Sequence, residues 1–319
     1  RWESFPEYMD YIASRRYSLD IGAQIAHGSL RYYVMGERGR MNEEATPDDL
    51  RQMSQLVTEA VQAGALGFST SRTIGHRALD GSPVPGTFAP DQELSAIADA
   101  MARAGRGVFE MIPAGTVGKL ERLGGERTTP EAEVKLMADF SRQSGRKVTF
   151  TLVQSPDYAP DTWERLLEMV VTANQTGAQL YPQVSSRPIG LASGLSGYHA
   201  FQRRPTYMKL AHLPLAERAR EMAKPEIKAA IMSETDVLVD QPGSMANMYQ
   251  LFQTAAMFLY PLADPVDYEP DPSEMLGSRA AATGQDVLDL LYDYLLEQDG
   301  AAMCALMGGP NVHDSQEVL

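Results

Sequence analysis

Residues 64–77 carry more side chains suited to chemistry than any other stretch that follows an apolar run in this chain. The run ends abruptly in hydroxyls, two arginines and a histidine. This pattern is typical of a buried strand whose carboxyl end opens onto a polar site, the edge at which parallel α/β sheets and barrels place their chemistry. The alternative is an ordinary loop whose arginines only pair with surface carboxylates. We predict substrate-binding roles for Ser69, Ser71, Arg72, His76 and Arg77.

Further polar side chains stand at the ends of other predicted strands. Residues 18–25 are apolar enough for a strand that His27 closes, and Gln154 and Gln183 close two later strands, the second with Arg187 nearby. The carboxyl ends of parallel strands meet at one edge of a sheet. We therefore expect these side chains to share a rim with the serines and arginines above.

Glu110 is the candidate metal ligand, because it falls inside a predicted strand at 108–112. A carboxylate there is costly unless it is paired or bound to a metal, and a neighbouring arginine as its partner is the alternative. The five histidines form no HxH, HxxxH or HExxH pattern, and Cys304 is the one cysteine, so spacing alone does not assemble a zinc site. A Ser-His-Asp triad stays open, without support from a GxSxG motif.

Predicted strands and helices alternate along the first 184 residues with a period of roughly 40 residues. The clearest helix spans 46–63: Thr46 caps it, Pro47 stands in its first turn, and apolar residues recur on one face. Such alternation predicts right-handed βαβ units around a parallel sheet, and hence an α/β fold. We count about five strands, whereas a closed barrel has eight.

The chain divides by composition into three expected parts. Residues 1–184 form the βα units, residues 185–275 a loop-rich and helical insertion or lid, and residues 276–319 a return to the barrel pattern. The chain begins at Arg1 without a methionine and ends in a helix-like stretch, which predicts a fragment.

Composition limits the classes of partner. With 44% hydrophobic residues, the 319-residue chain can bury a sizeable core. The net charge of -14 leaves no basic footprint, so we expect neither nucleic acid nor an anionic membrane as partner. We find no apolar run of about 18 residues and no signal peptide, and we expect a cytoplasmic protein.

Several of these segments resemble a known family. QIAHGSLR at 24–31 with VMG at 34–36, GALGFST at 64–70, and Phe88-Ala89 with Glu93-Leu94 are similar to consecutive segments of the N-acyl-D-amino-acid deacylases (D-aminoacylases) of amidohydrolase family 3. YPLADP at 260–265 through Glu269-Pro270, and Gly284 with Asp286, resemble its later connector and helix. The loop at 67–88 looks like that of a divergent branch.

This resemblance implies a metal-dependent hydrolase on a (β/α)8 TIM-type barrel, incomplete in this chain, with zinc or another divalent metal as cofactor. In the family, the metal makes a bound water nucleophilic, and an aspartate on the last strand acts as general base and acid. By their match to the family motif, His27 and Arg31 are implied to line the site. The positive charge of Arg72 or Arg77 suits a substrate carboxylate.

The chain departs from the family pattern at the metal ligands. The family's HxH pair would precede Arg1 and its aspartate would follow Leu319, so the ligands lie mostly outside this chain. Where the family has histidines after two central strands, this chain has FEMI at 109–112 and TLVQ at 151–154. Three alternatives stay open: a mononuclear site completed from outside, Glu110 in place of a lost ligand, or a branch without zinc hydrolysis.

We therefore expect a hydrolase of non-peptide C–N amide bonds, one that deacylates an N-acyl-D-amino acid or a related small molecule through a metal-activated water. The alternatives are a cyclic-amide hydrolase on the same barrel and a catalytically silent barrel that serves as a binding subunit. The expected partner is a small-molecule substrate, and a second copy of the chain or a complementing chain segment is left open. The residues leave the catalytic side chains unassigned.

Overall fold

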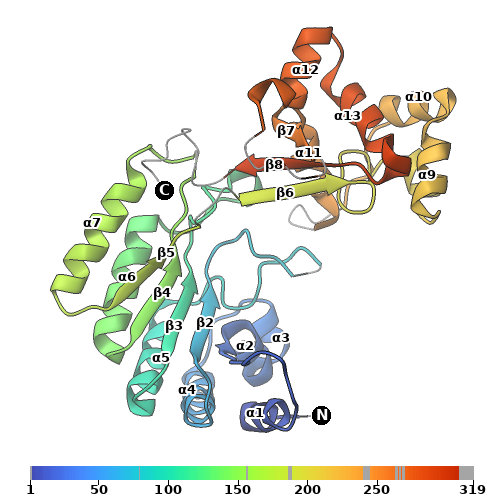
Figure 1. The fold of residues 1–319 in the computed structure, drawn as a ribbon. Helices are drawn as coiled ribbons and strands as arrows, with labels where there is room; N and C mark the ends of the chain where they lie inside the picture. The colour runs from blue at the N-terminus through green and yellow to red at the C-terminus, as the bar shows by residue number, and fades with distance from the viewer. Residues whose placement is uncertain are drawn as a thin grey trace. The chain divides into compact units, whose positions relative to one another are not determined.

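The computed structural model describes residues 2–78, 80–155, 157–185, 189–239, 245–262, 265, 267 and 270–308. The chain divides into two compact units, one of residues 1–78 with 82–185 and one of residues 79–81 with 186–319. Each unit has a hydrophobic core of its own. Figure 1 traces the elements of both along the chain.

Five parallel strands form the sheet of the first unit, in the order β1-β2-β3-β4-β5. They are β1 (Ile25–Ala26), β2 (Gly67–Ser71), β3 (Val108–Ile112), β4 (Lys147–Thr151) and β5 (Leu180–Gln183). Because all are parallel, their carboxyl ends share one edge of the sheet. The predicted α/β class with a parallel sheet is confirmed. Over the described residues the sheet stays open, with β1 and β5 as its edges, as expected for an incomplete barrel.

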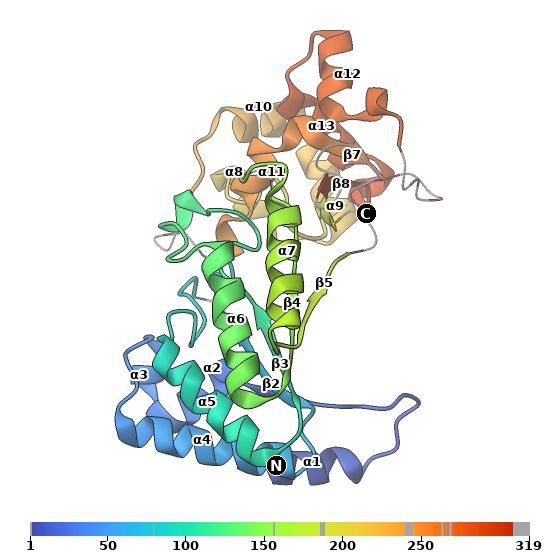
Figure 2. The same ribbon diagram turned by 90° about the vertical axis from the view of Figure 1, so that its left-hand side faces the viewer.

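Helices connect the strands and cover one face of the sheet, as Figure 2 shows. The longest is α4 (Pro47–Gln62), which begins where its sequence predicts: the Thr46 hydroxyl accepts from the backbone N–H of Asp49 at 3.2 Å. The covering helices α4 to α7 pack against one another in chain order. The other helical elements of this unit are α1 (Phe5–Ala13), α2 (His27–Met35), α3 (Glu37–Arg40), α5 (Asp91–Ala104), η1 (Glu121–Leu123), α6 (Pro130–Ser144) and α7 (Thr162–Gln175).

Burial alternates along the strands and distinguishes the two faces of the sheet. Phe68 and Phe109 are buried on the helix-covered face, and the ring of Phe109 stacks on that of Phe140 with centroids 3.9 Å apart. Neighbouring strand positions point the other way and stay partly or fully exposed, because successive strand residues face opposite sides. We call this second side the polar sheet face and define it by Ser69, Ser71, Glu110, Thr149, Thr151, Tyr181 and Gln183.

The strand predicted at 18–25 is wrong over most of its length. Only Ile25 and Ala26 pair with a neighbouring strand, opposite Phe68 and Ser69. Upstream, Leu19 is 80% and Ile21 47% exposed, so these apolar side chains find no surface to pack on. Three polar or glycine residues interrupt the run, which leaves too little apolar area to hold a strand.

The second unit contains a three-stranded antiparallel sheet in the order β6-β8-β7. Residues 276–308, which we expected to return to the barrel, lie in this unit, because β8 pairs with β6 and β7. Its strands are β6 (Ile189–Gly194), β7 (Leu259–Pro261) and β8 (Met303–Gly308). Its helical elements are α8 (Pro205–Leu210), α9 (Leu215–Met222), α10 (Pro225–Ser233), η2 (Met245–Asn247), α11 (Tyr249–Thr254), η3 (Ala256–Phe258), η4 (Pro272–Glu274), α12 (Leu276–Thr283), α13 (Val287–Leu296) and η5 (Gln298–Gly300).

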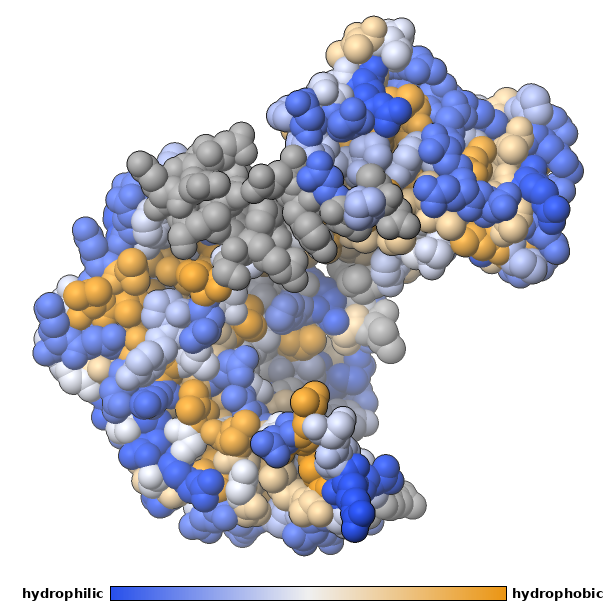
Figure 3. Space-filling view, viewed as in Figure 1, coloured by the Kyte–Doolittle hydropathy of each residue, from blue (hydrophilic) through white to orange (hydrophobic). Residues whose placement is uncertain are grey.

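Apolar side chains remain on the surface of the first unit around α7 and β5, where Figure 3 shows an orange area. Val171 is 50%, Tyr181 46% and Val184 62% exposed. They lie on or beside the last strand and helix of the described sheet, where the sheet has an edge. No described helix has the length and apolar character that crossing a membrane requires.

Candidate functional site

The structure places the predicted site residues on two sides of the first unit's sheet, some near the carboxyl ends of its strands and others, Ser69 and Glu110, in the middle of theirs. His27 and Arg31 lie on the helix-covered side and are each only 1% exposed. Ser69, Ser71, Glu110 and Gln183 lie on the polar sheet face. The side chains that we expected to share one rim therefore form two separate groups, one on each side of the sheet.

His27 is fixed by partners on both of its ring nitrogens. Nδ1 lies 2.8 Å from the hydroxyl of Thr70 on β2, and Nε2 lies 2.6 Å from a carboxylate oxygen of Glu93 on α5. Arg31, one turn further along α2, donates to both oxygens of the same carboxylate and to the backbone carbonyl of Glu43. This buried group ties α2, β2 and α5 together at the end of β1.

The charges in this group follow from burial and hydrogen bonding. Burial lowers the pKa of His27, against the raising effect of Glu93, so the imidazole stays neutral and donates from Nε2. Burial alone would raise the pKa of Glu93, but the hydrogen bonds from His27 and Arg31 and the positive charge of Arg31 outweigh it and hold that pKa below its usual value. The group therefore pairs one carboxylate with one guanidinium, which makes burial tolerable.

The loop at 83–87 covers His27. The side chain of Asn42 fastens this loop by donating to the carbonyl oxygens of Pro83 and Val84 and accepting from the backbone N–H of Gly86 at 2.8 Å. A Cβ on Gly86 would lie 2.7 Å from Nδ1 of His27. The loop therefore leaves no room for a substrate group beside this imidazole.

Arg72 leaves the end of β2 and turns to α6. Its Nε donates to both carboxylate oxygens of Glu133, at 3.1 and 2.9 Å, and its Nη1 donates to the carbonyl of Ala89 at 2.8 Å. The backbone N–H of Ala114 adds a second donor to Glu133 at 3.3 Å. Burial raises the pKa of Glu133 more than the charge of Arg72 lowers it. Arg72 thus forms a buried ion pair with Glu133.

Ser71 and His76 meet on the exposed side of the same loop. The Ser71 hydroxyl and His76 Nδ1 are 2.8 Å apart; Ser71 is partly exposed and His76 is exposed. Arg77 donates from Nη2 to the carbonyl of Leu123 at 3.4 Å, and burial lowers its pKa, with a partly compensating effect of Glu126. This loop is the part of the predicted site where a hydroxyl, an imidazole and a guanidinium occur together.

Glu110 lies in the middle of β3, opposite Ser69 on β2 and Thr149 on β4. It is partly exposed on the polar sheet face, and the structure gives its carboxylate no hydrogen bond or ion pair with any described residue. The alternative partner, a neighbouring arginine, is not found among the described residues. Gln183 shares this face and lies opposite Thr151. Gln154 follows β4 and is partly exposed, whereas Arg187 lies outside the described residues.

Two glutamates of this edge were not predicted as site residues from the sequence. Glu93 and Glu133 each lie in the first turn of a helix, reach back to the end of a strand and neutralise a cation there. The signal was present: each follows a proline by three positions, in Pro90-Asp91-Gln92-Glu93 and in Pro130-Glu131-Ala132-Glu133. Acidic residues in the first turn of a helix usually lie in solvent and interact favourably with the helix dipole. For this reason the two glutamates were not assigned to the site.

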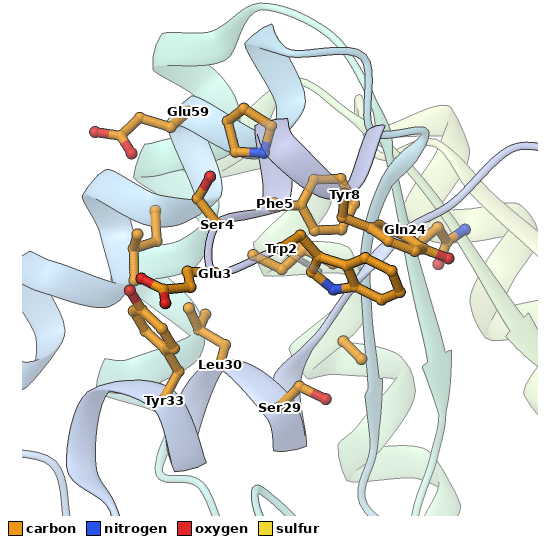
Figure 4. Close-up of a pocket in the computed structure, with 14 residues that line it drawn as sticks. Trp2, Glu3, Ser4, Phe5, Tyr8, Gln24, Ser29, Leu30, Tyr33 and Glu59 are labelled. Atoms are coloured by element: carbon orange, nitrogen blue, oxygen red, sulfur yellow. The ribbon is translucent and has the colours of Figure 1, made fainter. Parts of the chain in front are cut away.

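A cavity of ≈ 430 Å³ opens between α1, α2 and α4, as shown in Figure 4. Four aromatic side chains, those of Trp2, Phe5, Tyr8 and Tyr33, contribute to its lining. None of the predicted site residues lines it. We therefore place the candidate site at the polar sheet face and the loop after β2.

The described residues do not by themselves fit the zinc ion that the family resemblance implies. Tetrahedral zinc sites take at least three protein ligands, and no three described His, Cys, Asp or Glu side chains converge. Glu110 is the one predicted ligand, and among the described residues neither a histidine nor a second carboxylate shares the polar sheet face with it. The prediction that the remaining ligands lie outside this chain stays a prediction.

The arrangement defines an α/β protein with a parallel sheet, a helix-covered face and a polar face at which hydroxyl, imidazole and carboxylate groups gather. No family model matches the chain, and no curated protein matches it. Several solved structures match the chain. The crystal structure of N-acyl-D-glutamate deacylase from Bordetella bronchiseptica, complexed with zinc and a phosphonate inhibitor, matches at 16% identity and a TM-score of 0.48, over 96% of this chain and 47% of its own.

D-aminoacylase, described as defining a novel subset of amidohydrolases, matches at 16% identity and a TM-score of 0.47, over 76% of this chain and 49% of its own. A further structure of D-aminoacylase, which concerns the role of its binuclear metal center, matches to the same extent. The chain spans about half the length of the solved structures it matches.

Proposed function

We propose that the protein hydrolyses the C–N amide bond of N-acyl-D-amino acids or related small amides, with the substrate lying over the polar sheet face. The observation that carries this proposal is the position of Ser69, Ser71 and Glu110 on one face of adjacent parallel strands. Parallel α/β sheets hold their substrates at this edge. The sequence resemblance to the N-acyl-D-amino-acid deacylases supplies the substrate class.

Arg77 is the residue we assign to the substrate carboxylate. Both arginines of the loop suit this role by charge and by their forked geometry. Arg72, however, turns to the helix-covered side, where it pairs with Glu133 on α6. Arg77 follows directly after His76, so a carboxylate bound there would hold the neighbouring amide near the Ser71–His76 contact at the surface.

The experiment is an assay of amine release by the full-length protein from N-acetyl-D-amino acids, with the L-enantiomers in parallel. We expect turnover of D-substrates, and faster turnover for those with a free carboxylate. Turnover of cyclic amides alone would favour the cyclic-amide hydrolase, and binding without turnover of any amide would favour the silent barrel. Either result contradicts the proposal.

Substitution of Glu110 tests the role of the polar sheet face directly. A carboxylate there can take a proton from water or hold a cation, and an amide can do neither, so Glu110→Gln is expected to lower kcat/KM by about 100-fold. The matched control is Thr149→Val, which alters the residue opposite Glu110 without removing a charge. Equal activity of Glu110→Gln and the wild type would remove Glu110 from the site.

A further inference from the structure

The cavity between α1, α2 and α4 combines aromatic rings with carboxylates. Its volume of ≈ 430 Å³ lies in the range of small-molecule sites. Three rings and two carboxylates that Figure 4 shows around the same hollow are those of Trp2, Tyr8, Tyr33, Glu3 and Glu59. Among the described residues that line the cavity there is no lysine, arginine or histidine. The cavity therefore presents π faces and negative charge to a ligand, without a cation of its own.

We infer that this cavity binds an organic cation, an ammonium group that carries an apolar substituent. The negative faces of aromatic rings attract an ammonium, and that of tryptophan does so most strongly. The two carboxylates attract the same charge, and an anion placed here would meet them without a compensating cation. The apolar substituent packs on Ile25 and Leu30, which are buried in the cavity wall. None of the predicted site residues lines the cavity, so this inference does not depend on the proposed function.

The segment that carries Trp2 and Glu3 is held at the start of α1. The backbone N–H groups of Glu3 and Ser4 donate to Oε2 of Glu7 at 2.7 and 3.2 Å. The Ser4 hydroxyl accepts from the backbone N–H of Glu7 at 3.3 Å and completes a capping box. The indole of Trp2 lies against the ring of Tyr8, with centroids 5.0 Å apart. Because these contacts exist before a ligand binds, less ordering is left to oppose binding.

The remaining walls belong to α2 and α4. Tyr33 extends from α2 and is 65% exposed, so its ring is available to a ligand from solution. Glu59 lies on α4, where its carboxylate accepts from the Gln55 amide at 2.7 Å and forms no ion pair with a described residue. The helix α1 packs on α4, and Phe5 packs against the core of the first unit. The carboxylate of Glu59 and the ring of Trp2 therefore face one cavity from two helices that are fixed to each other.

The test is titration calorimetry of the full-length protein with three small probes that share a phenyl ring. They are benzyltrimethylammonium, which keeps its charge at every pH, neutral benzyl alcohol and anionic phenylacetate. We expect benzyltrimethylammonium to bind about tenfold more tightly than benzyl alcohol, the combined size of cation–π and exposed charge contacts. Phenylacetate is expected to bind more weakly than benzyl alcohol. Equal affinities for the three probes, or no binding of any, would overturn the inference.

Removal of the cavity's negative charge tests the source of this preference. The double variant Glu3→Gln with Glu59→Gln is expected to lower the affinity for benzyltrimethylammonium about fivefold and to leave that for benzyl alcohol unchanged. The matched control is Glu164→Gln with Glu168→Gln, which removes two exposed carboxylates of α7 outside the cavity. Because the chain carries a net charge of -14, this control separates the local carboxylates from the overall field. Equal losses in the two double variants would overturn the inference.

The indole of Trp2 locates the bound probe. In the full-length protein with ¹⁵N-labelled tryptophan, the Trp2 N–H signal is assigned by its loss in Trp2→Phe and is expected to shift on addition of benzyltrimethylammonium. Trp2→Leu keeps an apolar side chain without a π face, so it is expected to lower the affinity for the cation about fivefold. Circular dichroism establishes that each variant is folded. Cation binding that moves no Trp2 signal and survives Trp2→Leu would place the ligand elsewhere and overturn the inference.

Discussion

Burial decides which ionisable side chains at the sheet edge keep their charge. Glu93 is fully buried, yet it accepts from His27 and from Arg31, and these hydrogen bonds hold its pKa below its usual value. His27 lies in the same buried environment and shares the carboxylate of Glu93 with Arg31, and burial lowers the pKa of its imidazole. A neutral imidazole between a hydroxyl and a carboxylate acts as a structural link, because both of its nitrogens are already occupied.

Replacing His27 by alanine is expected to destabilise the first unit by about 3 kcal/mol, the cost typical of breaking a buried hydrogen-bonded charge group. The substitution removes one partner from Glu93 and one from Thr70, and it leaves a cavity beside Phe68, whose ring centroid lies 5.2 Å from that of His27. Both tryptophans, Trp2 and Trp163, lie in this unit, so fluorescence during urea unfolding measures its stability.

His76→Ala is the matched control for this stability measurement. Its imidazole is exposed and hydrogen-bonds to Ser71 at the surface, so its removal is expected to change the free energy of unfolding by no more than about 0.5 kcal/mol. Equal losses in the two variants would mean that the buried group of His27 does not hold the strand end to the helices.

At the scale of elements, the first turns of α5 and α6 perform the same task. Each helix places a buried glutamate, Glu93 or Glu133, against a cation from the end of a strand or the helix that follows it. The partial positive charge of a helix start favours a carboxylate there, and the buried cation supplies the remaining stabilisation. The connection between strand end and helix start is thus an ion pair on the helix-covered side.

The loop at 83–87 closes this side, and Gly86 is the position that permits it. Its φ is +96°, and an added Cβ would lie 2.7 Å from Nδ1 of His27. Gly86→Ala is therefore expected to cost about 3 kcal/mol, from backbone strain and displacement of a buried ring. Gly145→Ala is the control: its φ is +64°, nothing lies within 4 Å of the added Cβ, and strain of about 1 kcal/mol remains.

Urea unfolding followed by tryptophan fluorescence compares the two glycine variants within one unit. If Gly86→Ala lowers the free energy of unfolding no more than Gly145→Ala does, the loop at 83–87 can move to accommodate the added Cβ without a loss of stability. In that case the imidazole of His27 would be open to ligands, and its predicted place in the substrate site would regain support.

Elements with strong local signals were predictable from the sequence, and the direction of side chains at their ends was not. The helix at 46–63 was correct because its cap, first-turn proline and apolar stripe all agree. The side on which His27 lies depends on a two-residue strand and on Glu93, which is 66 residues away. The contact of Ser71 with His76 needs only a tight loop, yet no spacing rule for such loops exists.

At the scale of the whole chain, the two units bury separate cores and contain different sheets. All predicted site residues belong to the first unit. The second unit carries its own buried histidine, His199, whose Nδ1 accepts from the backbone N–H of Phe201 at 3.2 Å. Its Nε2 is buried with no hydrogen-bond partner among the described residues, and its ring meets that of Tyr207 edge-on at 4.5 Å.

This histidine is expected to make the second unit sensitive to acid. Burial, with a smaller contribution from Arg218, lowers the pKa of His199 from 6.5 to about 3. Between these values the unfolded chain binds a proton that the folded unit does not, so stability falls as the pH drops below about 6.5. The loss is about 1.4 kcal/mol per pH unit, or about 3 kcal/mol by about pH 4.5.

Hydrogen exchange of peptides from residues 199–239 measures this loss, because the second unit has no tryptophan. In His199→Asn the side-chain oxygen can still accept from Phe201, but this side chain no longer titrates, so the loss of protection per pH unit is expected to be smaller by about 1.4 kcal/mol. His212→Asn, which alters an exposed histidine of the same unit, is expected to keep the wild-type slope. If His199→Asn kept that slope as well, protonation of His199 would not be what weakens the unit, and the acid response would have to come from its carboxylates.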